Sequence, residues 1–142
     1  MGPDNLAVMI KENADELSKR LCKDLFSREE TKSYHKLNQD VIYGRVHEVY
    51  SKLDTWLRGG KAKSGEMKAY FVDLGRKRSG EGIPLQDEIM LLMLIKRHLW
   101  LFVLEKNFLD SSYELQNALQ FNNRVVVFFD SVIFYVSKGY EA

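Results

Sequence analysis

The chain has 142 residues, enough for one domain with its own hydrophobic core, and its composition of 45% hydrophobic and 29% charged residues is that of a globular protein. Its 21 basic and 20 acidic residues leave a net charge of +1, which excludes the strongly basic face of a nucleic-acid-binding domain and a polybasic attraction to anionic lipid. Cys22 is the single cysteine, so an intrachain disulfide and a zinc site built from several cysteines are excluded as well.

The N-terminal half predicts two helical segments. The first covers about residues 5–25, where helical spacing brings together one apolar stripe: Ile10, Ala14, Leu17, Leu21 and Leu25. Ser27 and Glu30 match a capping box and predict that a new helix begins there. The second segment covers about residues 29–58, with a break expected near Asn38, and has its own stripe: Ile42, Val46, Val49, Leu53 and Trp56.

The C-terminal half predicts three more helices, separated by breaks. "RGGKAKSG" (58–65) is expected to be a loop in which Gly59 and Gly60 end one helix and Ser64 caps the next. "SGEGIP" (79–84) predicts a second break, followed by a helix with Pro84 in its first turn. In "LDSSYE" (109–114), Ser111 and Glu114 form another capping box. The last helix, about 112–138, carries a long stripe: Leu115, Leu119, Asn122, Val126, Phe129, Ile133 and Val136.

One stretch of the last segment, "RVVVFFDSVIFYV" (124–136), is rich in β-branched and aromatic residues and is also compatible with a strand. A single strand without a partner elsewhere would leave its backbone groups unpaired, so a helix is the preferred interpretation. The sequence therefore predicts an all-α, single-domain bundle of about five helices.

The most apolar stretch, residues 82–104, is interrupted by Lys96, Arg97 and His98. Three adjacent helical residues point about 100° apart, and a central Lys or Arg costs roughly 2.5–3.5 kcal/mol in a bilayer, so a membrane span is excluded. A helix that is apolar on nearly every side is typical of the centre of a bundle. We therefore expect a core helix here, with Leu99 and Trp100 at the heart of the domain.

His98 allows a second interpretation, as a haem ligand with Leu91, Leu94 and Phe102 as an apolar pocket wall. A lone histidine among apolar residues is more often a satisfied core or boundary residue, so no cofactor is expected and haem remains the weaker alternative. His35 and His47 do not share a helical face suitable for a metal ion.

No motif indicates catalysis. "GEGIP" lacks the Lys-Ser/Thr of a phosphate-binding loop, and no nucleophile stands in a recognisable setting. The adjacent carboxylates Glu29/Glu30 and Asp87/Glu88 fall at predicted helix N-termini, where the helix dipole stabilises negative charge. The chain is therefore not expected to be an enzyme.

Residues 70–100 resemble the N-terminal domain of the RsbT co-antagonist family, the RsbR-type and RsbD-type stressosome proteins of bacteria. The matching features are Leu74-Gly75 followed by Arg78, the Gly-Ile-Pro-Leu of residues 82–85, and the apolar helix with Trp100. The segment around Trp56 and the ending Gly139-Tyr140-Glu141 fit the same layout.

The resemblance implies a cytoplasmic, dimeric, haem-free sensory domain with a globin-like or bundle fold, which passes a signal to a C-terminal output domain. No kinase core or anti-sigma-antagonist domain follows here, so we expect residues 1–142 to be an input domain cut from a longer signalling protein. A haem- or small-ligand-binding sensor and a stand-alone protein-binding adaptor remain open alternatives.

Two groups of residues are candidates for interaction or signalling. Arg76 and Arg78 are expected at the end of their helix, where they stabilise its terminal carbonyls or contact a partner. Phe129, Asp130 and Ile133 belong to the apolar run of the last helix, which is richer than one face of a small bundle needs. That run predicts a homodimer built on the last helix, with Phe129 in the interface.

Overall fold

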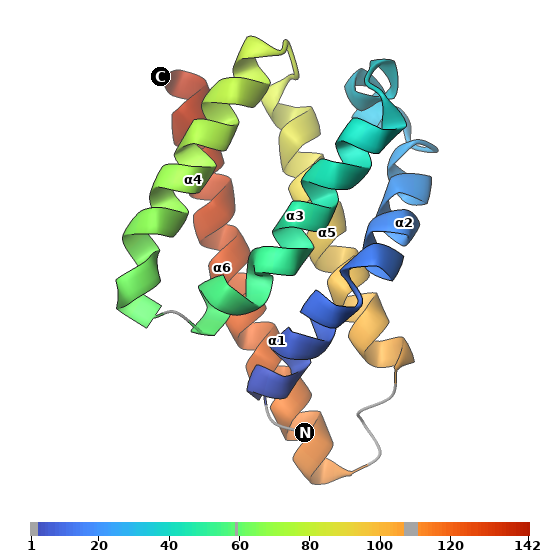
Figure 1. Ribbon diagram of the computed structural model, residues 1–142, viewed down its shortest axis with the longest axis vertical. Helices are drawn as coiled ribbons and strands as arrows, with labels where there is room; N and C mark the ends of the chain where they lie inside the picture. Colours follow the sequence, from blue (N-terminus) through green and yellow to red (C-terminus); the bar gives the residue numbers. More distant parts are fainter. Residues whose placement is uncertain (1–2, 59, 107–110) are drawn as a thin grey trace.

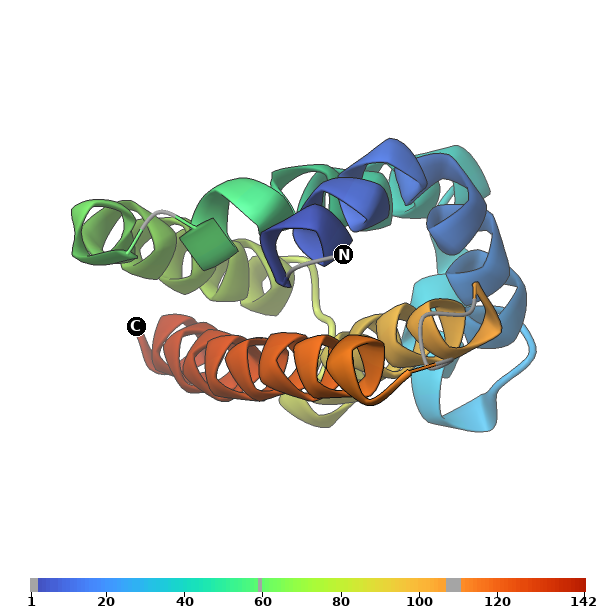
Figure 2. The same ribbon diagram turned by 90° about the horizontal axis from the view of Figure 1, so that it is seen from below.

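A computed structural model describes residues 3–58, 60–106 and 111–142, and it confirms the all-α class: within these ranges every regular element is a helix. The elements are α1 (Pro3–Glu12), α2 (Ala14–Leu25), the 3₁₀ helix η1 (Glu29–Lys36), α3 (Gln39–Arg58), α4 (Gly60–Gly80), α5 (Leu85–Glu105) and α6 (Ser112–Glu141). In Figure 1 the long helices α3, α4, α5 and α6 run roughly along the length of the molecule. Figure 2 shows α5 and α6 in one layer, with α1, α3 and α4 opposite them and α2 beside α5.

The first predicted helix is in fact two helices. Its expected stripe is buried as predicted, from Ile10 to Leu25. Between α1 and α2, however, the Asn13 side chain donates a hydrogen bond to the Met9 carbonyl oxygen at 2.8 Å. Asparagine competes well for backbone groups, so it interrupts the helix while the apolar stripe continues. The count of about five helices was too low partly for this reason.

The segment between α2 and α3 begins a helix where expected, but not through the predicted capping box. The Ser27 hydroxyl donates to the Asp24 carbonyl oxygen at 2.7 Å, behind it in the chain, and is therefore not the cap. The new element is a 3₁₀ helix. The break near Asn38 is confirmed, since Asn38 Oδ1 accepts from the Asp40 backbone N–H at 2.7 Å at the start of α3.

The predicted loop over residues 58–65 is wrong. α3 continues to Arg58 and α4 begins at Gly60, so Ser64 lies inside a helix and does not cap one; Gly59 lies outside the described residues. A glycine inside a helix costs only about 1 kcal/mol of stability. Against this small cost, α4 packs along α6 in the most extensive contact between any two of the described helices. Tertiary packing therefore outweighs the weak local preference.

The turn after α4 agrees with the prediction. Gly82 has φ of 79°, a left-handed conformation that glycine adopts without strain. The Ile83 N–H donates to Arg78 O at 3.1 Å and the Gly82 N–H donates to Ser79 O at 3.0 Å, the two bonds of a Schellman ending. Ile83 is buried behind the turn, and Pro84 is the residue that precedes the first turn of α5.

α5 is a core helix, as predicted, but it is not surrounded by other helices, since Met93, Leu101 and Leu104 are exposed on it. One side of it is buried along its whole length, including Leu91, Ile95, Leu99 and Phe102. Trp100 is only half-buried and packs on the edge of the core, so of the two residues expected at the heart of the domain Leu99 alone lies there. Among the described residues no helix is long and apolar enough to cross a membrane.

α6 settles the choice between strand and helix for residues 124–136, which are helical throughout. It starts as predicted: Ser111 Oγ accepts from the Glu114 backbone N–H at 3.1 Å; residues 107–110, before it, lie outside the described residues. The apolar side of α6 covers the core through Phe121, Val125, Phe129 and Val132.

Candidate functional site

The C-terminal turn of α6 crosses α4 in close backbone contact. A Cβ atom added to Gly139 would lie 2.1 Å from the Val72 carbonyl oxygen, and one added to Gly75 would lie 2.2 Å from the Val136 carbonyl oxygen. No side chain fits at either position without moving a backbone. Both glycines are buried, and together they place the end of α6 directly on the backbone of α4.

Arg78, one turn beyond Gly75 on α4, lies among charged groups at this end of the molecule. Its side chain is 11% exposed, and its Nη1 donates to Glu81 Oε1 at 3.2 Å. Arg45 of α3 binds the same carboxylate with Nη1 at 3.1 Å and also through Nη2. Burial lowers the pKa of Arg78. Partial burial acts to raise the pKa of Glu81, but the two arginines outweigh it and lower that pKa overall.

Glu88, in the first turn of α5, is the most unusual titratable group of the site. Its side chain is 2% exposed, and its Oε2 has no hydrogen-bond partner among the described residues. Burial raises the pKa of Glu88 to about 8. Its neighbour Asp87 is also buried but accepts from the Ser33 hydroxyl at 2.5 Å. The two carboxylates, expected to be simple helix N-terminal charges, therefore have different environments.

A small cavity adjoins Glu88 between α3, α4 and α5. Its volume is about 20 Å³, enough for one water molecule, and its walls are mostly apolar, with Val46, Leu74 and Leu92 among them. Arg45 and Arg78 line the same cavity. A buried carboxyl group thus lies close to two guanidinium groups that both bind a different carboxylate, Glu81.

Tyr140, the residue after Gly139, brings the end of α6 into the same site. Its hydroxyl is buried and, within the described part of the chain, has no hydrogen-bond partner. Burial raises the pKa of Tyr140, and the negative charges of Glu88, Glu81 and Asp87 add to the increase, whereas Arg78 acts against it. The last turn of α6 is therefore electrostatically linked to Glu88 and Arg78.

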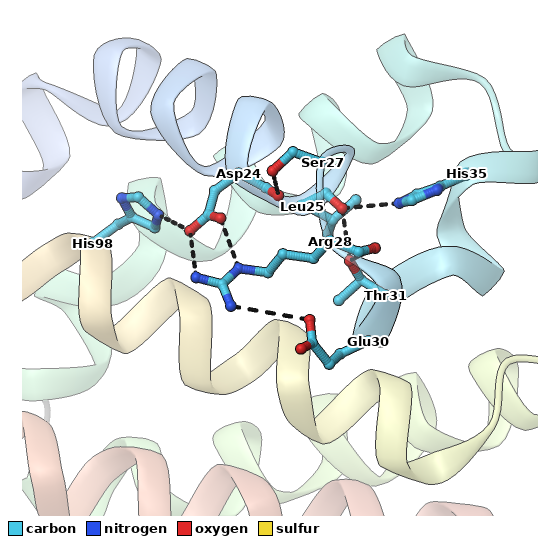
Figure 3. A network of polar contacts seen from close by, with 8 residues as sticks. All are labelled: Asp24, Leu25, Ser27, Arg28, Glu30, Thr31, His35 and His98. Atoms are coloured by element: carbon cyan, nitrogen blue, oxygen red, sulfur yellow. Dashed lines mark hydrogen bonds and ion pairs between the residues drawn. The ribbon is translucent and has the colours of Figure 1, made fainter.

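A second polar cluster joins α2, η1 and α5 and is drawn in Figure 3. His98 Nε2 lies 2.8 Å from Asp24 Oδ2, and Arg28 Nε lies 2.6 Å from Asp24 Oδ1. Figure 3 shows both side chains pointing at the one carboxylate. Partial burial acts to raise the pKa of Asp24, but the bonds from Arg28 and His98 prevail and lower it.

The same end of η1 is held by bonds to a single carbonyl oxygen. Thr31 Oγ1 donates to Leu25 O at 2.6 Å, and His35 Nε2 lies 2.9 Å from the same oxygen (Figure 3). These bonds use the carbonyl group that the end of α2 leaves free. The polar side chains of this cluster are therefore paired with one another or with backbone groups.

This geometry bears on the haem alternative. The Nε2 atom of His98, one of the two atoms that could bind iron, is engaged by Asp24. The proposed pocket wall of Leu91, Leu94 and Phe102 is itself closed core, each side chain at most 5% exposed. In the part of the chain that the structure describes, no group of three or more His, Cys, Asp or Glu side chains could hold a metal ion.

The remaining predicted site residues are dispersed. Arg76 is exposed and forms a 3.6 Å ion pair with Asp73, away from the cluster around Arg78. Asp130 is exposed on α6, and Ile133 is half-buried. The prediction that Phe129 belongs to an exposed interface is wrong: its side chain is 1% exposed in the core, because α6 turns this position toward α4 and α5.

Sequence analysis identified Arg78 but missed Glu88 and the roles of Gly75 and Gly139. The carboxylate pair Asp87/Glu88 looked ordinary because helix N-termini attract acidic residues. One signal was available: Glu88 is three and four residues before Leu91 and Leu92, on the apolar side of its helix. Comparison of the chain with protein-family models, with curated proteins and with solved structures finds no match.

Proposed function

We propose that this chain is the non-enzymatic N-terminal sensory domain of a bacterial signal-transduction protein of the RsbT co-antagonist type. The signal leaves through the C-terminal end of α6 and reaches an output domain or signalling partner. The observation that carries the proposal is the crossing of α4 and α6 at Gly75 and Gly139. Two of the residues on which the family resemblance rests, Gly75 and Gly139, are far apart in sequence and meet at this crossing.

The crossing provides a physical route for a signal. With no side chain between the two helices, a shift of α4 must displace the last turn of α6, since packed backbones cannot absorb the movement. Arg78 and Tyr140 lie beside the contact, so a change of charge there acts on the same two helices. The end of α6 would then transmit rotation or sliding to whatever follows it.

An insertion series tests this role. One to seven alanines would be placed after Ala142, between α6 and the output domain in the full-length protein, and output activity measured with and without the stimulus. Transmission through a continuous helix should make the response periodic, recovering near insertions of three to four and of seven residues, because a helix turns every 3.6 residues. A response that does not depend on insertion length would contradict the proposal and favour the adaptor alternative.

We further propose that the sensory domain is a homodimer. The predicted stripe of α6 remains partly exposed at Leu115, Leu119 and Val126, which are 43%, 50% and 37% exposed. Leu119, Val126, Ile133 and Tyr140 are seven residues apart, so they share one side of α6, and Tyr140 places that side next to α5.

The neighbouring helix adds to this apolar surface. α5 exposes Met93, Leu101 and Leu104, which recur at helical spacing on the side opposite its core face. Two exposed apolar stripes on adjacent antiparallel helices suit a symmetric four-helix contact with a second copy. The interface thus uses the side of α6 that borders α5, and not Phe129.

Light scattering tests the dimer. The wild-type chain should give about twice its 16.6 kDa mass, and Leu119→Glu should shift it toward the monomer. Val127→Glu is the matched control, because Val127 is 66% exposed on the same helix but outside the stripe. A monomeric wild-type chain at high micromolar concentration would rule out this interface without affecting the sensory assignment.

A further inference from the structure

The packing of the helices alone does not explain why position 88 carries a buried carboxyl group. It lies in an apolar environment between α3, α4 and α5, and its Oε2 is unpartnered within the described residues. A leucine would avoid the cost of leaving a buried polar atom unpaired, and a glutamine would keep the same shape without a titratable group. What distinguishes Glu88 from these is that its charge can change.

The charged and polar groups near Glu88 come from three other helices and a turn. Arg45 extends from α3 and Arg78 from α4, Glu81 lies in the turn between α4 and α5, and Tyr140 comes from α6. Asp87 precedes it on α5 and is occupied by Ser33. The two arginines that line the cavity with Glu88 are both bound to Glu81 instead.

Ionisation of Glu88 would change which carboxylate the neighbouring arginines favour. A carboxylate without a partner is far more costly to bury than a carboxylic acid, so the charged form needs a cation or donor. Arg78 has little solvent contact to lose, since its side chain is already 11% exposed, and it lines the same cavity. The Tyr140 hydroxyl is a free donor at the same site.

We propose that Glu88 is a proton-operated switch: when its carboxyl group releases a proton to solvent, Arg78 leaves Glu81 for Glu88 and the C-terminal turn of α6 changes its docking on α4. The link to α6 is the contact of Gly75 and Gly139, one turn from Arg78 and one residue from Tyr140. The switch involves only this chain's residues. The further claim that this switch makes pH the input signal of a sensory domain rests on the proposed function.

Carbon-13 NMR of the isolated chain is the direct test. The side-chain carboxyl carbon of Glu88 and the backbone carbonyl carbon of Gly139 would be followed from pH 5 to pH 10. We expect both signals to titrate with one midpoint near pH 8. The Gly139 titration should disappear in Glu88→Gln, whose side chain matches the neutral acid in shape. Glu114→Gln, at the opposite end of α6, is the matched control and should leave both titrations unchanged.

A separate variant tests the role of Arg78 in the switch. Glu81→Gln removes the carboxylate that holds Arg78, so Arg78 becomes available to Glu88 and the Glu88 midpoint should fall by about one pH unit or more. An unchanged midpoint would show that Arg78 is not the partner and overturn the exchange. The switch as a whole is overturned if wild-type Glu88 titrates near pH 4.5, or if it titrates near pH 8 while Gly139 does not move.

Failure of the switch and failure of the proposed function give different results. If Gly139 follows Glu88 in the isolated chain but output activity in the full-length protein ignores both pH and the insertion series, the switch stands and the sensory role fails. If the insertion series is periodic but Glu88→Gln leaves the output unchanged between pH 6 and pH 9, the sensory role stands and the proton input is wrong.

Discussion

Two titratable side chains of α5, Glu88 and His98, differ in what surrounds them. His98 is 16% exposed and contacts Asp24, which in turn binds Arg28, so each charged group of that cluster has a partner. Glu88 is 2% exposed, and the two arginines that line its cavity bind Glu81 instead. The paired cluster fixes three elements in one arrangement. The unpaired carboxyl group favours its neutral form and leaves a second arrangement accessible, which is the physical requirement for a switch.

The two regions should therefore respond to pH with opposite signs. The folded pKa of Glu88 lies above its unfolded value, so its contribution to stability is complete below about pH 4.5 and is lost as pH rises through about 8. The folded pKa of Asp24 lies below its unfolded value of 3.8, so its contribution is present above that pH and is lost on acidification.

The largest effect is expected from Glu88→Gln in alkaline solution. The rise of the pKa from 4.5 to about 8, at about 1.36 kcal/mol per unit, predicts that the variant is more stable than the wild type by roughly 5 kcal/mol at pH 9. Near pH 4.5 the two should be nearly equal, because both bury a neutral group. Urea denaturation at the two pH values measures the difference. An equal difference at both would show that the charge of Glu88 is not the cause.

Next in size is the α4–α6 crossing, tested by two alanine substitutions on one helix. Gly75→Ala should destabilise by about 3 kcal/mol, because its Cβ would lie 2.2 Å from the Val136 carbonyl oxygen and force the two backbones apart. Gly65→Ala has nothing within 4 Å and should stabilise α4 by about 0.5–1 kcal/mol. Thermal denaturation of both variants should show opposite shifts of Tm. Two shifts of the same sign would contradict the close contact.

Removing a charge from the paired cluster around Asp24 should cost less stability than the changes at the α4–α6 crossing. Asp24→Asn removes the charge that binds both Arg28 and His98, and we expect a loss of about 2 kcal/mol at pH 7. As pH falls from 7 to 3 this loss should shrink, because the unfolded wild-type chain takes up a proton at Asp24 before the folded chain does. Asp130→Asn, on the exposed side of α6, is the control and should change the free energy of unfolding by less than about 0.5 kcal/mol. A loss that stays constant down to pH 3 would argue against an ionic origin.

The smallest changes in stability are expected at the two arginines of α4, and they should differ between Arg78 and Arg76. Arg78→Gln removes a half-buried group bound to Glu81 and should cost about 1 kcal/mol. Arg76→Gln removes an exposed pair with Asp73 and should be neutral within about 0.5 kcal/mol. Chemical denaturation at pH 7 compares them. If the order were reversed, the exposed arginine would have a stabilising contact that the Asp73 pair does not explain.

Much of the fold could be predicted from local chemistry. Helical spacing of apolar residues indicated the all-α class, and it outweighed the β-branched composition of residues 124–136. The Schellman ending at Gly82 and the cap at Ser111 were predictable because each involves hydrogen bonds between residues at most five positions apart. The break at Asn13 was missed, since a single asparagine interrupts a helix in some settings and not in others. The loop expected over residues 58–65 was also wrong, because α4 already begins at Gly60.

The candidate site could not be predicted to the same extent. Gly75 and Gly139 share no local pattern, and only the crossing of α4 and α6 gives them a common role. Phe129 belonged to the expected stripe of α6, but that stripe is wider than one face, and packing decided that Phe129 turns inward while Leu119 stays exposed.

By itself the sequence determined where most helices begin and end, because capping and turn bonds join near neighbours in the chain. Only the tertiary structure decided which charges are paired. Asp24 meets His98, and Glu88 meets no partner for its Oε2 within the described chain, because pairing depends on which helices lie side by side. The pKa of a carboxyl group follows from burial and from partners distant in sequence, and neither is visible in the residues that flank it.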